Sequence, residues 1–253
     1  MSDPGETTDP DGVADQLAAL RADNARLRRL LDDAGAPDGL RHAFRDTLAM
    51  LRAMVRRSAE CAEDEAGFAT VARYAAHLEG RLDALARVRA GLDAFGEADL
   101  HMLVSDELLS VFVREGERAT LDGPGVRLRP KAAQVLALAV HELASNAVAH
   151  GPLGAGDGRV DVTWTVRAGA DAPVLALTWT EGGGTVSAGT RPTGPARRGF
   201  GTAVLEEMLA YDLGAQTTLA HAPDGARCAI LLPLTARVGH VVEDADPPEA
   251  SVP

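Results

Sequence analysis

The chain has 253 residues, of which 46% are hydrophobic and only 4% aromatic, so we expect one or two domains with a core of Leu, Val and Ala. A formal net charge of −12 argues against a nucleic-acid-binding protein, which usually carries a basic face. Two cysteines are too few for a disulfide framework, the acidic N-terminus is no signal peptide, and no apolar run approaches the roughly 20 residues of a membrane helix. These features predict a cytoplasmic protein with neither nucleic-acid nor membrane partners.

The N-terminal part of the chain is expected to contain a coiled coil. Residues 1–12 have no hydrophobic periodicity and are expected to be disordered. Residues 13–34 predict a coiled-coil segment, because apolar residues recur in steps of four and three and Asn24 stands where an asparagine favours a parallel dimer. The alternative is a single amphipathic helix on a globular surface.

Residues 37–96 predict an antiparallel helical hairpin. Both helices carry an apolar stripe with little else in the hairpin to bury it, so two hairpins should pair into the four-helix bundle of a homodimer. The stripe of the first helix is Leu40, Phe44, Leu48, Leu51 and Val55. The stripe of the second helix is Phe68, Val71, Ala75, Leu78, Leu82, Leu85 and Leu92.

Residues 97–237 have the mixed pattern of an α/β domain, which gives the whole chain an α+β fold class. Helices are expected at 100–113, 131–149 and 201–213, and strands at 118–121, 126–128, 160–167, 174–179, 216–220 and 227–234. Gly214 suits the left-handed position after a helix. The acidic tail, residues 238–253, is expected to be disordered.

The expected helix 131–149 contains a carboxylate and an amide that share one face. Glu142 and Asn146 are four residues apart, so their side chains project one helical turn from each other. Such a pair can hold a hydrated Mg²⁺, which needs only one or two protein ligands when nucleotide phosphates supply the rest. The alternative is an exposed polar face on a core helix.

Two glycine-rich segments follow this helix. Residues 179–184 (WTEGGG) end a predicted strand, where glycines permit close approach of a flat ligand and a carboxylate can accept the adenine amino group. Residues 197–202 (RRGFGT) open a predicted helix, where backbone N–H groups and arginines favour phosphate. Each segment alone is weak evidence and is also compatible with an ordinary turn.

In this order, the three segments resemble those of a known family. Residues 141–147 (HELASNA) look like the N box of GHKL ATPases, residues 179–184 like the G1 box of the HWE class of sensor histidine kinases, and residues 199–202 like the G2 box after an ATP lid. By this resemblance Asn146 would bind Mg²⁺, Glu142 would be catalytic or polarising, and Glu181 would contact adenine. The other implied ATP-site positions are His141, Trp179, Gly183, Arg198, Gly199, Gly201 and Thr202.

The first hairpin helix carries a candidate phospho-acceptor, His42. It matches the acceptor position of the HWE class, although Ala43 and Asp46 stand where relatives have Arg and Asn. At about 100° per residue His42 lies opposite the apolar stripe, so it should be exposed and reachable by a nucleotide. The alternative is an ordinary surface histidine.

The resemblance implies a two-component protein histidine kinase. It would use ATP and Mg²⁺ to phosphorylate His42 and would then pass the phosphoryl group to an Asp of a response-regulator receiver domain. The input would come from another protein or a separate sensory subunit. One alternative is a degenerate, non-catalytic relay or scaffold that docks a response regulator, which Ala43 and Asp46 favour. Another is a gyrase-like or chaperone ATPase, against which the His42 hairpin argues.

Overall fold

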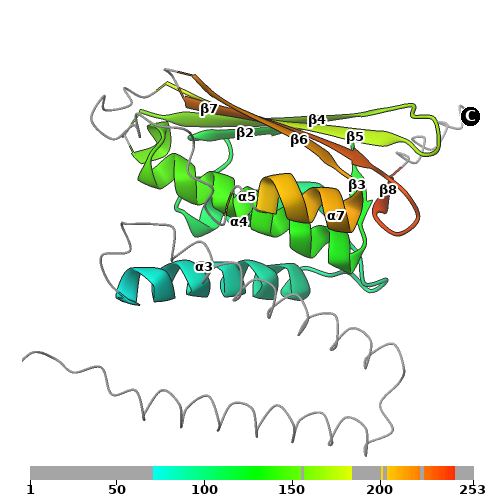
Figure 1. Cartoon of the computed structure of the whole chain (residues 1–253), viewed down its shortest axis with the longest axis horizontal. Coiled ribbons are helices and arrows are strands. Elements are labelled where there is room, and N and C mark those ends of the chain that lie inside the picture. The colour runs from blue at the N-terminus through cyan, green and yellow to red at the C-terminus, as the bar shows by residue number, and fades with distance from the viewer. Residues whose placement is uncertain (1–70, 155–156, 184–200, 202–203, 223–224, 243–253) are drawn as a thin grey trace, which may run out of the picture. The chain divides into compact units, whose positions relative to one another are not determined.

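The computed structural model describes residues 71–154, 157–183, 201, 204–222 and 225–242 (Figure 1). The chain divides into two compact units, residues 1–54 and 55–253, and all the described residues belong to the second. The predicted coiled coil, the first hairpin helix and His42 lie outside the described residues.

A five-stranded sheet forms one layer of this unit. The strand order is β2-β4-β5-β7-β6, with β2 parallel to β4 and every other pair antiparallel. Alternate residues of the two long central strands are buried, which is the period expected of a sheet with one covered face. The strands are β2 Ala119–Asp122, β4 Arg159–Arg167, β5 Val174–Gly182, β6 Gln216–Ala222 and β7 Gly225–Pro233.

A second, three-stranded sheet has the order β1-β3-β8. Its strands are β1 Ala98–Asp99, β3 Val126–Leu128 and β8 Gly239–Val241. The expected strands 118–121 and 126–128 therefore exist as β2 and β3 but belong to different sheets. β8 lies inside the range 238–253 that we expected to be a disordered tail. That prediction is wrong for these residues, because Val238 is buried and β8 pairs with β3.

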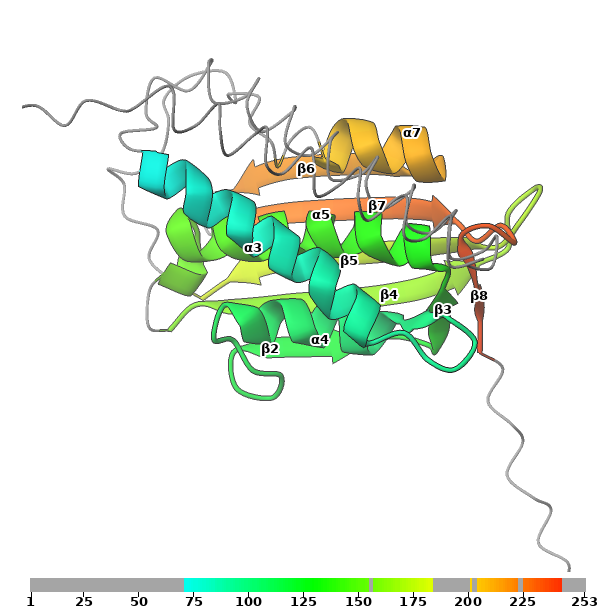
Figure 2. The ribbon, with the colours of Figure 1, turned by 90° about the horizontal axis from the view of Figure 1, so that it is seen from below.

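Helices cover one face of the five-stranded sheet, and α3 lies on the far side of that helical layer (Figures 1 and 2). The expected helices 100–113, 131–149 and 201–213 correspond to α4, α5 and the π-helical segment η2 followed by α7, and Gly214 has the predicted left-handed conformation, with φ 67°. The elements are α3 Val71–Ala90, α4 Leu100–Ser110, α5 Pro130–Ala149, the 3₁₀ turn η1 Pro152–Gly154, η2 Val204–Met208 and α7 Leu209–Leu213. These elements confirm the mixed helix-and-sheet fold class.

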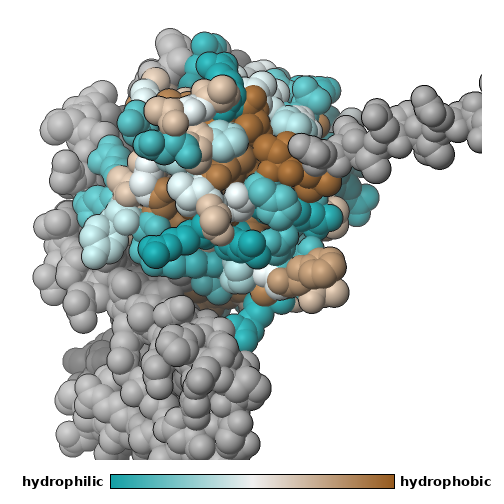
Figure 3. All heavy atoms as spheres, turned by 90° about the vertical axis from the view of Figure 1, so that its right-hand side faces the viewer, coloured by the Kyte–Doolittle hydropathy of each residue, from teal (hydrophilic) through white to brown (hydrophobic). Residues whose placement is uncertain are grey.

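α5 is the central core helix. Thirteen of its 20 residues are buried, because it contacts α3, α4 and α7 as well as lying under the sheet. By length and composition α5 would also qualify as a membrane span, which corrects the expectation that no such run exists. In this fold 78% of the qualifying window is buried inside the protein, as in a core helix. Figure 3 shows one end of this unit, where apolar areas of the surface lie between hydrophilic areas.

α3 packs on α5 through a stripe that differs from the predicted heptad pattern. The buried residues are Arg81, Ala84, Leu85 and Val88, which follow the i, i+3, i+4, i+7 spacing of one helix face. Leu82, which the heptad pattern placed on the apolar stripe, is 38% exposed. The heptad stripe and the face buried on α5 are therefore two different stripes that share Leu85.

Candidate functional site

The second half of α5, the end of β5 and Gly201 come together in the structure. A Cβ placed on Gly201 would lie 3.0 Å from Oε2 of Glu142 and 3.4 Å from Nδ2 of Asn146. A Cβ on Gly151, just after α5, would lie 2.7 Å from Oε2 of Glu181. Three segments that are far apart in the sequence thus meet around one end of α5, with glycines at the closest approaches.

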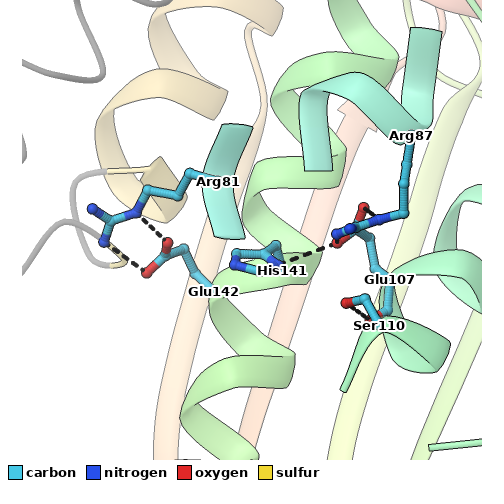
Figure 4. Close-up of polar contacts among 6 residues, drawn as sticks. All are labelled: Arg81, Arg87, Glu107, Ser110, His141 and Glu142. Carbon is cyan, nitrogen blue, oxygen red and sulfur yellow. Dashed lines mark hydrogen bonds and ion pairs between the residues drawn. The ribbon is translucent and has the colours of Figure 1, made fainter. Parts of the chain in front are cut away.

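Glu142 is a buried carboxylate paired with an arginine of α3. It is only 7% exposed, and Nε of Arg81 donates to its Oε1 over 2.8 Å while Nη2 of Arg81 lies 3.5 Å from Oε2 (Figure 4). Arg81 is 6% exposed, so both charges of this pair are largely removed from water. Sequence patterns predicted Glu142 but gave no indication of this partner.

Asn146 lies one turn after Glu142 and is exposed. Gly201 approaches both side chains, so they share a face of α5. The exposed amide offers an oxygen of the kind that Mg²⁺ prefers. Among the described residues there is no cluster of three or more His, Cys, Asp or Glu side chains suited to a metal. A cation held here could take the amide oxygen of Asn146 as one of its ligands.

Trp179 and Glu181 form a fixed pair at the end of β5. Trp179 is fully buried, and its Nε1 donates to Oε1 of Glu181 over 3.2 Å. The backbone N–H of Ala226, on β7, donates to Oε2 of the same carboxylate over 3.0 Å, and Glu181 is 4% exposed. Gly183 follows with a φ of 85°, a conformation that favours glycine. Trp179 therefore lies in the core and orients Glu181, while the strand turns away immediately afterwards.

His141 belongs to a buried ionic network that joins three helices. Its Nδ1 lies 3.3 Å from Oε2 of Glu107, a residue of α4 that is 1% exposed. Arg87, on α3, donates to both oxygens of Glu107 over 3.1 and 2.6 Å (Figure 4). A buried carboxylate is tolerated only when it is paired, so this network fixes α3, α4 and the His141 end of the motif together.

The network shifts the pKa of the carboxyl group next to Glu107. A separate group, a buried thiol in the sheet, also has a raised pKa. Partial burial raises the pKa of Asp106, and the adjacent Glu107 charge raises it further while Arg87 opposes the shift. Burial raises the pKa of Cys228 to about 12. Cys228 lies opposite Trp179 across the β5–β7 pair and is 1% exposed, so this thiol is part of the core.

The structure describes only some of the predicted site residues. It brings together Glu142, Asn146 and Gly201, and it places Glu181 against Gly151. His42, Arg198, Gly199 and Thr202 lie outside the described residues. Sequence reasoning missed Arg81, Arg87 and Glu107. A signal was present for Glu107, because it interrupts the apolar stripe of α4, whose other buried members are Leu100, Leu103, Val104 and Leu108.

Comparisons with known proteins agree with these motifs. A family model described as HWE histidine kinase matches residues 39–125. A blue-light-activated histidine kinase of Rhizobium johnstonii is 32% identical over 202 residues, covering 78% of this chain and 50% of that protein. Blue-light-activated histidine kinase 1 of Erythrobacter litoralis is 32% identical over 177 residues, covering 68% of this chain and 45% of that protein. The chain thus spans about half the length of the curated relatives that it matches.

A solved structure supports the fold. The EL346 blue-light activated histidine kinase of Erythrobacter litoralis superimposes with a TM-score of 0.52 and 16% identity, over 75% of this chain and 59% of that one. At this identity the likeness concerns the fold alone. Together with the three boxes and the matched relatives, it leads to one conclusion: the chain belongs to the HWE histidine kinases and has their GHKL-type fold.

Proposed function

We propose that the chain is the kinase core of a two-component system, which autophosphorylates His42 with Mg·ATP and passes the phosphoryl group to a receiver-domain Asp. The observation that carries this proposal is the meeting of Glu142, Asn146 and Gly201 at one end of α5. A scaffold needs neither a carboxylate and amide on one helix face nor a glycine against them. The identity to relatives named histidine kinases supports the same activity.

Each residue would have a distinct task in the reaction. An imidazole nitrogen of His42 forms a bond to the γ-phosphorus, the bond from that phosphorus to the bridging oxygen breaks, and ADP leaves. Glu142 would accept the proton that the imidazole releases, and Glu181 would accept a hydrogen bond from the adenine amino group. Asn146 would hold Mg²⁺, which neutralises phosphate charge when bound. Such a transfer depends mainly on positioning and charge stabilisation, which fits the buried and hydrogen-bonded carboxylates of Glu142 and Glu181.

The remaining site residues complete the proposal by their place in the family motif. Gly183 and Trp179 would shape the adenine side, and His141 would fix the helix that carries Glu142 and Asn146. The phosphate side would be formed by Arg198, Gly199, Gly201 and Thr202. The working protein would be a cytoplasmic homodimer. The domains would be a coiled coil at 13–34, a phosphotransfer hairpin at 37–96 and an ATP-binding domain at 97–237.

Calorimetry with Mg·ATP tests nucleotide binding. Wild type should bind, and Asn146→Ala should weaken binding at least tenfold with an unchanged circular dichroism spectrum, because this exposed side chain is not part of the core. Gln134→Ala, three turns earlier on the same helix, is the matched control and should bind like wild type. Absence of binding by wild type at millimolar nucleotide would reject the kinase in favour of the scaffold.

A further inference from the structure

Two adjacent residues of α3 contact two adjacent residues of α5. On α3, Gly80 approaches the ring of His141 and Arg81 binds the carboxylate of Glu142. The first contact needs a glycine, because a Cβ at residue 80 would lie 2.9 Å from Nε2 and 3.1 Å from Cε1 of His141. α3 is thus fitted to the part of α5 that carries the proposed catalytic carboxylate.

Arg81 faces both carboxylate oxygens of Glu142, and in the proposed reaction one of these oxygens would accept the proton. Two guanidinium nitrogens of Arg81 face the two carboxylate oxygens, and both residues are less than a tenth exposed. A guanidinium stays protonated at every physiological pH, so it cannot relay a proton from the acceptor imidazole to this carboxylate. In this arrangement an imidazole would have to displace Arg81 before Glu142 could accept its proton.

We infer that Arg81 is an inhibitory latch: its ion pair with Glu142 holds the kinase in a resting state, and separation of α3 from α5 at this point releases the carboxylate for phosphoryl transfer. The inference rests on the proposed function of Glu142. It extends that function by naming the residue that regulates the site.

The energetics of a buried ion pair suit a reversible latch. Removing both charges from water costs much of the attraction that they gain, so the net stability of such a pair is small although its geometry is specific. A second contact supports the closed arrangement six residues further along α3, where Arg87 binds Glu107 over 2.6 Å. That contact lies away from Glu142 and can keep α3 attached while the Arg81 end opens.

The test is the initial rate of autophosphorylation of the full chain at saturating Mg·ATP carrying a labelled γ-phosphate. Arg81→Gln should raise the rate about tenfold, equivalent to ~1.4 kcal/mol of barrier. Gly80→Ala should raise it as well without touching either charge, because its methyl group pushes against His141, whose ring is held by Glu107. Alanine is also the better helix former, so loss of α3 would not explain the result. Arg89→Gln, on the exposed side of the same helix, should leave the rate unchanged.

The outcomes separate the latch from the proposed function. A labelled wild type together with an equal or slower Arg81→Gln variant, at unchanged ATP affinity, would overturn the latch and leave the kinase standing. In that case Arg81 would position Glu142 for catalysis instead of restraining it. Absence of label in wild type and in both opened variants, with ATP still bound, would overturn the kinase and the latch together.

Discussion

Removal of the Glu107 carboxylate should destabilise the domain far more than removal of an exposed carboxylate. Glu107→Ala takes away both acceptors of Arg87 and the partner of His141, and it does so at a site that is 1% exposed. Breaking a buried pair by deleting one partner costs about 3–5 kcal/mol. The Arg87 side chain is 28% exposed and can be partly rehydrated, so we expect a loss at the lower end, about 3 kcal/mol.

Urea denaturation monitored by circular dichroism measures this loss as a lower midpoint at constant slope. The matched control is Glu115→Ala, which removes a carboxylate whose contact to His101 is 2.9 Å long but lies between side chains that are 37% and 42% exposed. An exposed pair of this kind contributes about 0–1 kcal/mol. A Glu107→Ala variant within about 0.5 kcal/mol of its control would refute the view that this network fixes the three helices.

Two further predictions concern described residues, and a third concerns the dimer that the sequence patterns predict. Trp179→Phe removes the donor to Oε1 of Glu181. We therefore expect a stability loss of about 1–3 kcal/mol in the same denaturation assay and weaker ATP binding by calorimetry. Unchanged values in both assays would show that the indole does not orient the carboxylate. Cys228, with its pKa raised to about 12, should resist thiol reagents at pH 8 in the folded protein and react after unfolding. Because the unfolded thiol ionises near its ordinary pKa of 9 and the folded one does not, this residue should lower the stability of the fold as the pH rises above about 9; a Cys228→Ala variant that loses stability equally steeply there would contradict this assignment. Light scattering at tens of micromolar should find a dimer, and a monomer would contradict the pairing expected of residues 13–95.

Local sequence patterns predicted most elements of the fold because each has a clear period or a clear end. The alternation of β4 and β5 and the position of Gly214 identified elements that the structure contains. The separation of β2 and β3 into two sheets was not predictable in this way, because it depends on the partners β4 and β8, which lie far away in the sequence. The same limitation explains β8, whose three residues acquire a strand conformation only by pairing with β3.

In the candidate site, the residues identified by local spacing were predictable from the sequence, and their partners from distant segments were not. Glu142 and Asn146 could be recognised because their spacing on one helix is a local property. Their distant partners were not predictable, since a heptad count on α3 favoured Leu82 for the buried stripe and gave Arg81 no role. A charged residue gains a place in a core only when an opposite charge meets it there, as Glu142 meets Arg81, and that requires the tertiary structure.

Phosphorylation of His42 can be tested by comparing wild type with His42→Gln after incubation with γ-labelled ATP and Mg²⁺. Wild type should take up label that is lost in acid and kept in alkali, as expected for a phosphohistidine, and His42→Gln should take up none while it still binds ATP. Acid-labile label of equal amount in His42→Gln would contradict the assignment of the acceptor. Absence of label in both proteins would contradict the kinase activity itself.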